Sequence, residues 1–333
     1  MKALDYHAVL PELLTPNDIE VSRRILGRRS LGELYSWMQD KTETFETPGG
    51  QQFRAIVDRG EESSKVVTTF AEVGTPFVPR FVVKSQITRA FVDPAESASL
   101  VAILNGKRGD EWLNYSKEER AALTKGDMAP IVGRVAHIAD AIGQPSEVTL
   151  IGTSQGAVGA LAYGANSSTP EAAVAAIEPP TVAQRSLLGL ARDFAGQHND
   201  LIGAVAANFT DDMTAISDLA QHIQNESHLS LKDLPDVWHR MTLPDTVAAI
   251  RGMTRATAAH DIEMSLEKGG AVVHAWGTLD AVSPVKDNRA IAARWRGNPR
   301  YNNYELPLSH AALTDVYVVY AALARQARAL RKS

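Results

Sequence analysis

The chain has 333 residues, of which 44% are hydrophobic and 22% are charged, and its formal net charge is −5. This length can bury a large core and fits one α/β domain that carries an insertion. The charge is mild and no long basic run occurs, so neither nucleic acid nor an anionic membrane is an expected partner. No apolar run approaches the roughly 18 residues that span a bilayer. The chain contains no cysteine, which excludes disulfides, thiolate nucleophiles and cysteine metal sites.

The amino-terminal segment gives no sign of export. Asp5, His7 and Glu12 lie where a secretory signal needs an uninterrupted apolar stretch. The lack of cysteine is also compatible with a reducing compartment. We therefore expect a cytoplasmic protein without a signal peptide, while the sequence indicates no oligomeric state.

Predicted strands alternate with predicted helices along the chain, which is typical of a mainly parallel sheet covered on both faces. The first 40 residues are expected to be helical and peripheral. Gly49 and Gly50 separate the first two β-rich runs, which therefore could form a hairpin. Strands are expected at 42–47, 52–58, 65–71 and 100–106, and helices at 79–92, from Ser116 to before Gly126 through a capping box with Glu119, and at 129–142.

The next segment combines a strand, a sharp turn and a helix. Residues 148–151 are apolar and lead directly into Gly152-Thr153-Ser154-Gln155-Gly156, after which small residues follow at helical spacing. A serine on so tight a turn needs glycine two residues away on each side, because neighbouring Cβ atoms would collide. Gly152 and Gly156 meet this need. The arrangement resembles the nucleophile elbow of the α/β-hydrolase superfamily.

This resemblance implies a chemical role for Ser154 and for the backbone around it. Ser154 would be the nucleophile, and the backbone N–H of Gln155 would donate one hydrogen bond to the oxyanion. The second donor would come from the loop that begins at Phe70, through the N–H of Glu72 or Val73. That loop departs from the His-Gly pattern of many family members. The Glu72 carboxylate would oppose a developing oxyanion unless its side chain turned away.

The resemblance also implies an acid and a histidine downstream, in the order serine, acid, histidine. His310 follows a short β-like run, YNNYELP, and precedes a helix expected at 312–331, so we assign it as the base. His274 lies inside the strand AVVHAW and is expected to be a packed strand residue. The remaining histidines are expected at the terminus, in a helix or in the cap: His7, His137, His198, His222, His228, His239 and His260.

Asp280 lies in a loop that resembles the glycine, aspartate and proline loop after the penultimate strand of these enzymes. It precedes His310 by about one helix and one strand, and it would orient the imidazole by accepting a hydrogen bond from one ring nitrogen. A helix-capping aspartate is the other interpretation. Two carboxylates compete for the role: Asp287, which falls in the helical segment past Pro284, and Glu178, which follows a strand.

Roughly 90 residues separate Glu178 from the next strand, more than a simple crossover needs. Helical patterns fill much of this stretch, at 186–196, 200–209, 211–225, 230–240 and 243–253. The stretch resembles the helical cap of many α/β-hydrolases, with apolar side chains that either pack or line a substrate pocket. His222 and His228 are six residues apart without a carboxylate at ligand spacing, so no metal site is expected.

The resemblance implies an eight-stranded, mostly parallel sheet flanked by helices, with the cap inserted. The segments would be 1–41 as a helical lead, 42–180 and 265–333 as the core, and 181–264 as the cap. The activity implied is covalent acyl transfer from a small-molecule acyl substrate to water, without a cofactor. A peptide or C–C bond, acyl transfer to another acceptor, and a catalytically silent binding module are the alternatives.

Overall fold

The computed structural model describes residues 12–71, 78–104, 115–168, 171–196, 244–255, 257–307, 310 and 317–332. Several predictions fall outside these residues. They concern the loop with Glu72 and Val73, the cap helices expected at 200–209, 211–225 and 230–240, and the cap histidines His198, His222, His228 and His239.

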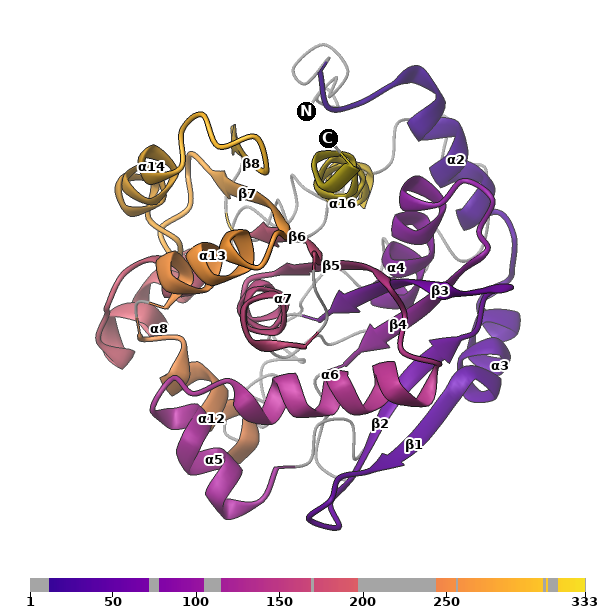
Figure 1. The fold of residues 1–333 in the computed structure, drawn as a ribbon, viewed down its shortest axis with the longest axis horizontal. Coiled ribbons are helices and arrows are strands. Elements are labelled where there is room, and N and C mark those ends of the chain that lie inside the picture. The colour runs from indigo at the N-terminus through magenta and orange to yellow at the C-terminus, as the bar shows by residue number, and fades with distance from the viewer. Residues whose placement is uncertain are drawn as a thin grey trace.

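One eight-stranded sheet forms the centre of the molecule, in the order β1-β2-β4-β3-β5-β6-β7-β8 (Figure 1). The strands are β1 (Thr42–Glu46), β2 (Gln52–Asp58), β3 (Glu62–Phe70), β4 (Ala98–Ile103), β5 (Glu147–Thr153), β6 (Ala173–Ile177), β7 (Ala271–Gly277) and β8 (Tyr301–Leu306). β2 runs antiparallel to β1 and to β4, while the pairs from β4 to β8 are parallel. The predicted hairpin and the predicted mostly parallel sheet are both confirmed.

Helices cover both faces of this sheet, as the alternating pattern predicts. Figure 1 shows α4 and α16 on one face and α6, α7 and α13 on the other. The helices are α2 (Pro16–Leu26), α3 (Leu31–Lys41), α4 (Val78–Val92), α5 (Lys117–Thr124), α6 (Ala129–Ala141), α7 (Gln155–Asn166), α8 (Leu187–Gly196), α12 (Pro244–Gly252), α13 (Ala258–Glu267), α14 (Val285–Arg294) and α16 (Tyr317–Lys332), with a 3-10 turn η1 (Pro180–Val182).

Local sequence signals explain where several helices begin. Ser116 accepts a hydrogen bond from the N–H of Glu119, whose carboxylate accepts one from the N–H of Ser116. This is the predicted capping box, and it satisfies two N–H groups that have no partner within α5. Ser30 and Glu33 make the same reciprocal contact at the start of α3.

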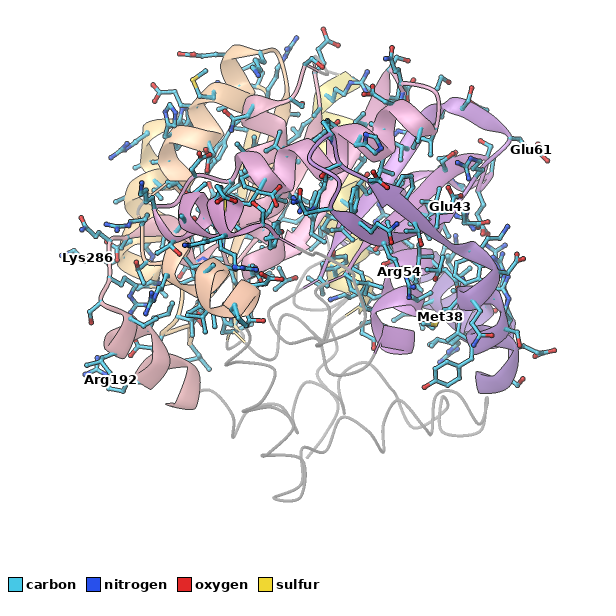
Figure 2. The ribbon with its side chains drawn as sticks, turned by 90° about the horizontal axis from the view of Figure 1, so that it is seen from below. Met38, Glu43, Arg54, Glu61, Arg192 and Lys286 are labelled. Carbon is cyan, nitrogen blue, oxygen red and sulfur yellow. The ribbon has the colours of Figure 1, made fainter. Side chains whose placement is uncertain are left out.

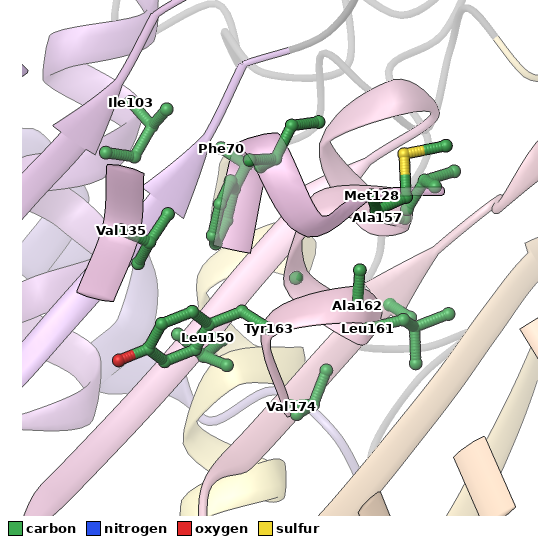
Figure 3. Packing of buried hydrophobic residues seen from close by; sticks show 14 of the residues in the cluster. Phe70, Ile103, Met128, Val135, Leu150, Ala157, Leu161, Ala162, Tyr163 and Val174 are labelled. Carbon is green, nitrogen blue, oxygen red and sulfur yellow. The ribbon is translucent and has the colours of Figure 1, made fainter. Parts of the chain in front are cut away.

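The core lies in two apolar clusters, one on each face of the sheet. Strands β5, β6 and β7 are buried almost throughout, as expected for parallel strands covered on both faces. Figure 3 shows Phe70 of β3, Leu150 of β5 and Val174 of β6 beside Leu161 and Tyr163 of α7. The whole of α7 up to Ala165 is buried, which places its amino-terminal end deep against the sheet.

The amino-terminal helices α2 and α3 lie at the outer edge of the molecule and bury one face in this core (Figure 1). Leu13, Leu34 and Met38 are buried in the cluster that also contains α4 and α16. Arg325 of α16 donates two hydrogen bonds to the Asp18 carboxylate, at 2.6 and 2.9 Å. Apolar contacts and this ion pair therefore join α2 to the last helix.

Of the individual helices expected in the cap, two lie within the described residues. α8 and α12 match the helices expected at 186–196 and 243–253. Arg120 of α5 donates to Asp245 of α12 at 3.1 Å, which anchors α12 to the core. α13 packs against α7 and β7. The segment boundaries of core and cap stay a prediction.

Charged side chains occupy the two ends of the described structure. Figure 2 shows Glu43 and Glu61 at the end that holds β1 and β2, and Arg192 and Lys286 at the opposite end. Among the described helices, none combines the length and the apolar character that crossing a bilayer requires.

Candidate active site

Four polar side chains follow four neighbouring strands of the sheet. Ser154 follows β5, Glu178 follows β6, Asp280 lies in the turn after β7, and His310 comes after β8. Because these strands are parallel, their carboxyl ends meet at one edge, the usual place for a site in an open α/β sheet.

Backbone hydrogen bonds continue the sheet past the ends of its strands. The N–H of Ser154 donates to the carbonyl of Ile177 at 2.9 Å, and the N–H of Glu178 donates to the carbonyl of Ala275 at 2.7 Å. These hydrogen bonds fix the backbone of Ser154 and of Glu178 at the carboxyl ends of β5 and β6.

Ser154 occupies a strained backbone conformation, with φ at 55° and ψ at −121°. This region is rarely populated by residues other than glycine and costs about 1–3 kcal/mol. A Cβ on Gly152 would lie 2.1 Å from the backbone carbon of Gly156, and one on Gly156 would lie 2.4 Å from the carbonyl oxygen of Phe70. The two glycines therefore permit the close approach of β5, α7 and β3 that forms the turn.

Ser154 lies directly before the amino-terminal end of α7. Gln155 is the first residue of α7, and the N–H groups of a first helical turn carry partial positive charge. The other predicted donors, Glu72 and Val73, lie outside the described residues.

Asp280 contacts both its own loop and His310. Its Oδ1 accepts hydrogen bonds from the N–H groups of Val282 at 2.7 Å and Ser283 at 2.8 Å, while Oδ2 lies 2.9 Å from Nδ1 of His310. Asp280 is 5% exposed and His310 is 4% exposed. The helix-capping interpretation and the catalytic interpretation of Asp280 are therefore compatible. One carboxyl oxygen caps the loop before α14, and the other contacts His310.

Glu178 lies on the other side of the same histidine. Its side chain is fully buried, and Oε2 lies 3.5 Å from Nδ1 of His310. Burial and the neighbouring Asp280 carboxylate raise the pKa of Glu178 well above its ordinary value, and the backbone N–H of Gly277 opposes this shift. Asp287, the other competitor, lies in the first turn of α14, and no contact joins it to His310 within the described part of the chain.

A second layer of hydrogen bonds, which the sequence did not predict, supports the Glu178 and Asp280 loops. Ser283 Oγ donates to the carbonyl of Pro179 at 2.9 Å and so ties the β7–α14 loop to the residue after Glu178. Asn288 donates to Ser283 and bonds to Nε2 of His274 at 2.8 Å. The only available signal was the polar character of Ser283 and Asn288 near the start of a helix.

His274 is buried in β7, as expected for a packed strand residue. Burial lowers its pKa to about 4, and the hydrogen bond with Asn288 opposes this shift only in part. The ring is therefore neutral at physiological pH.

The side chains of Glu178, Asp280 and His310 offer ligand atoms within 4.8 Å of one another, close enough to surround one metal ion. However, the 2.9 Å between Asp280 Oδ2 and His310 Nδ1 is a normal hydrogen-bond length, and Asp280 Oδ1 already accepts two backbone hydrogen bonds. We therefore interpret the group as a hydrogen-bonded acid and base set.

Neither protein-family models nor curated protein sequences give a match to this sequence. Solved structures do match, at probability 1.00. An enol-lactonase from Burkholderia xenovorans LB400 is 13% identical, with a TM-score of 0.51, and the match covers 81% of this chain and 93% of the lactonase.

Two further similar structures are esterases. A carboxylesterase structure from the archaeon Nitrososphaera gargenis is 13% identical, with a TM-score of 0.51 over 82% of this chain and 92% of that one. An esterase from Pyrococcus furiosus is 10% identical, with a TM-score of 0.50 over 83% of this chain and 86% of that one. Together with the strand order and the turn at Ser154, these matches show that the chain has the fold of the α/β-hydrolase superfamily.

Proposed function

We propose that the protein is a serine hydrolase that cleaves a carboxylic ester or a related acyl bond through an acyl-Ser154 intermediate. The observation that carries the proposal is the 2.9 Å contact between His310 Nδ1 and Asp280 Oδ2 at the sheet edge where Ser154 sits on its strained turn. A strained serine and a histidine oriented by a carboxylate, both at the same edge of the sheet, are the parts that activate a hydroxyl as a nucleophile.

In the proposed mechanism, His310 Nε2 takes the proton of Ser154 Oγ as that oxygen attacks the substrate carbonyl carbon. The carbonyl oxygen becomes an oxyanion, which accepts a hydrogen bond from the N–H of Gln155 and one from the N–H of Glu72 or Val73. The histidine then gives its proton to the leaving alkoxide. This step releases an alcohol and leaves the acyl group on Ser154.

Water completes the cycle by the same steps in reverse order. His310 removes a proton from the water, the hydroxide adds to the acyl carbon, and the proton returns to Ser154 Oγ as the carboxylic acid leaves. Asp280 stays ionised throughout, holds Nδ1 protonated and stabilises the imidazolium that forms twice in each cycle.

The strain at Ser154 supports an enzyme over a binding module. A φ of 55° at a residue other than glycine costs free energy. A fold that only binds a partner gains nothing from this strained conformation, whereas a catalytic serine needs it. The esterase and lactonase structures named above share this fold, which makes an ester the first substrate class to test. Amides, C–C bonds and acyl acceptors other than water are then tested with the same variants.

The predicted cap, residues 181–264, suggests a closed and mainly apolar acyl pocket. We therefore propose a small-molecule ester with a short acyl chain as the substrate. In a p-nitrophenyl ester series, turnover should be best with short acyl chains. Hydrolysis that keeps improving up to emulsified triglycerides would contradict a closed pocket.

The test of the proposed function compares p-nitrophenyl ester hydrolysis by wild type, Ser154→Ala and Ser265→Ala. Ser265 is a matched control because its side chain is also buried but sits in α13, where its hydroxyl donates to the Asp261 carbonyl. We expect Ser154→Ala to lose hydrolysis and Ser265→Ala to keep it. Equal turnover in wild type and Ser154→Ala would contradict the proposal, as would a folded wild type that is inactive on every acyl substrate.

A further inference from the structure

Two carboxyl groups, not one, face His310. Asp280 Oδ2 lies 2.9 Å from Nδ1 and Glu178 Oε2 lies 3.5 Å from the same nitrogen. Neither carboxyl side chain has any exposed surface. Two buried carboxylates this close cannot both ionise without a large electrostatic cost, so the pair is expected to keep one proton.

The hydrogen bonds around the two groups indicate which of them keeps that proton. Asp280 accepts from Val282 and Ser283 at Oδ1 and faces the ring nitrogen of His310 at Oδ2. Three donors favour the charged form of a carboxyl group. The hydrogen-bond donors around the pair are therefore gathered on Asp280.

Glu178 has the opposite surroundings. Both of its oxygens are buried without a partner at normal hydrogen-bond geometry among the residues that the structure describes. The backbone N–H of Gly277 faces the carboxyl group and opposes the rise of its pKa only in part. A carboxylate in that position would therefore lose its hydration with little compensation. A neutral carboxyl group, in contrast, can donate its own O–H to the adjacent Asp280, the interaction that raises its pKa alongside burial.

The titratable groups that face Glu178 come from two neighbouring segments. Asp280 comes from the β7–α14 loop and His310 from the segment after β8; within the described residues, no lysine or arginine contributes to the pKa shift of Glu178. The backbone also holds Glu178 in place, because its φ is 53° and its N–H donates to Ala275. The position of this side chain is thus fixed by the end of β6.

We propose that Glu178 is a positioning residue that stays neutral and donates a hydrogen bond from its O–H to Asp280. When Asp280 is neutralised, Glu178 loses its proton to solvent and takes over as the carboxylate partner of His310. This inference rests on the proposed function of Ser154, Asp280 and His310. The proton stays within the carboxyl pair during turnover, so no further reactant is required.

A double-mutant cycle tests the proposal, with kcat/KM measured for wild type, Glu178→Gln, Asp280→Asn and the double variant. Removing the charge of a triad acid costs about 10⁴-fold in kcat where no other carboxylate replaces it. We expect Asp280→Asn to lose far less, about 10²-fold, because Glu178 no longer faces a charged neighbour and can ionise beside His310. The double variant should show the full loss of about 10⁴-fold.

Two results in this cycle would overturn the proposal. Equal losses for Asp280→Asn and the double variant would show that Glu178 does not take over. A loss in Glu178→Gln as large as in Asp280→Asn would show that Glu178 is the ionised acid itself. Asp287→Asn serves as the matched control, because Asp287 lies in α14 without a contact to His310 among the described residues, and it should keep wild-type activity.

A pH profile separates this role from simple packing. Glu178 must lose its proton to replace Asp280, so the activity of Asp280→Asn should rise with pH over a range in which wild type is already constant. The double variant should lack this additional rise. An identical pH profile in wild type and Asp280→Asn would contradict the proposal.

Infrared difference spectroscopy gives a readout that does not depend on hydrolysis. At neutral pH the wild type should show the carbonyl stretch of a buried neutral carboxyl group, and Glu178→Gln should lack it. Absence of that band in the folded wild type would overturn the neutral state of Glu178. If the band is present while Ser154 is inert, the proposed function fails and the shared proton stands.

Discussion

Alanine at position 156 should damage the protein, although alanine is a better helix former than glycine. Gly156 lies in the first turn of α7, and an added Cβ would lie 2.4 Å from the Phe70 carbonyl oxygen and 3.0 Å from that of Ala71. Both oxygens belong to the backbone at the end of β3. A carbon normally stays about 3.3 Å from a carbonyl oxygen, so α7 must move away from β3 by about 1 Å.

That displacement has two measurable consequences. Forcing an extra methyl group into a packed core costs about 1–3 kcal/mol of unfolding free energy. The same shift moves Ser154, which immediately precedes α7, and a misplacement of about 1 Å at a reacting group costs roughly 10²-fold in rate. We expect Gly156→Ala to show both losses.

Gly133→Ala is the matched control because Gly133 is also helical, in α6, and nothing lies within 4 Å of its added Cβ. This substitution should raise the unfolding free energy by about 0.5–1 kcal/mol and leave activity unchanged. Urea unfolding and p-nitrophenyl ester hydrolysis measure the two effects. A Gly156→Ala variant as stable and as active as Gly133→Ala would refute the close approach of α7 to β3.

Three further predictions concern buried charged and titratable groups. The folded pKa of His274, about 4, lies below its ordinary 6.5, so the unfolded state binds more protons than the folded state between these pH values. The free energy of unfolding should therefore fall by about 1.4 kcal/mol per pH unit on acidification from pH 6.5 to pH 4. In urea unfolding, His274→Gln should abolish this drop. Glu178 has a raised pKa, so its contribution to stability declines as pH increases above about 4.5. The melting temperature of Glu178→Gln relative to wild type should therefore be higher at pH 8 than at pH 5. The same difference in melting temperature at pH 5 and at pH 8 would contradict this. Arg134 is 1% exposed and forms a bidentate ion pair with Glu119. In urea unfolding, Arg134→Met should lower the free energy of unfolding by about 3 kcal/mol. Arg289→Met, which removes an exposed ion pair with Glu305, should lower it by less than about 1 kcal/mol.

Local signals account for the parts of the fold that could be predicted from the sequence. The capping box at Ser116 fixes the start of α5, and the glycine turn at 49–50 predicts the β1–β2 hairpin. The order of the strands depends on tertiary contacts that no local pattern encodes. β3 begins at Glu62, before the expected 65, because Glu62 donates its N–H to Ser97 and pairs with Ala98 across an irregular register.

The structure brings together two of the predicted site residues, Asp280 and His310. The sequence could favour Asp280 through its loop, but it gave no means of placing Glu178 against the same histidine. Glu178 and His310 lie 132 residues apart, and they meet only because β6 and β8 both border β7 in the parallel sheet. The burial that raises the pKa of Glu178 is likewise a property of the assembled sheet.

The amino-terminal helices show a different limit of sequence reasoning. The helical character of the first 40 residues was predicted, but the packing partner of each helix was not. Asp18 meets Arg325 across nearly the whole chain, at 2.6 Å, and buried leucines from both segments join one cluster. The contact that joins a terminal helix to the core therefore depends on the folded chain and not on the helix's own pattern.

The most direct test of the central claim is the site at which a fluorophosphonate reacts with the folded wild type. This reagent forms a stable covalent adduct with an activated serine hydroxyl. We expect mass spectrometry of the digested protein to find one adduct, on Ser154, and Ser154→Ala to lose labelling while keeping its circular dichroism spectrum. Labelling at another serine, unchanged labelling in Ser154→Ala, or a folded wild type that never reacts would contradict the account of Ser154 as the nucleophile.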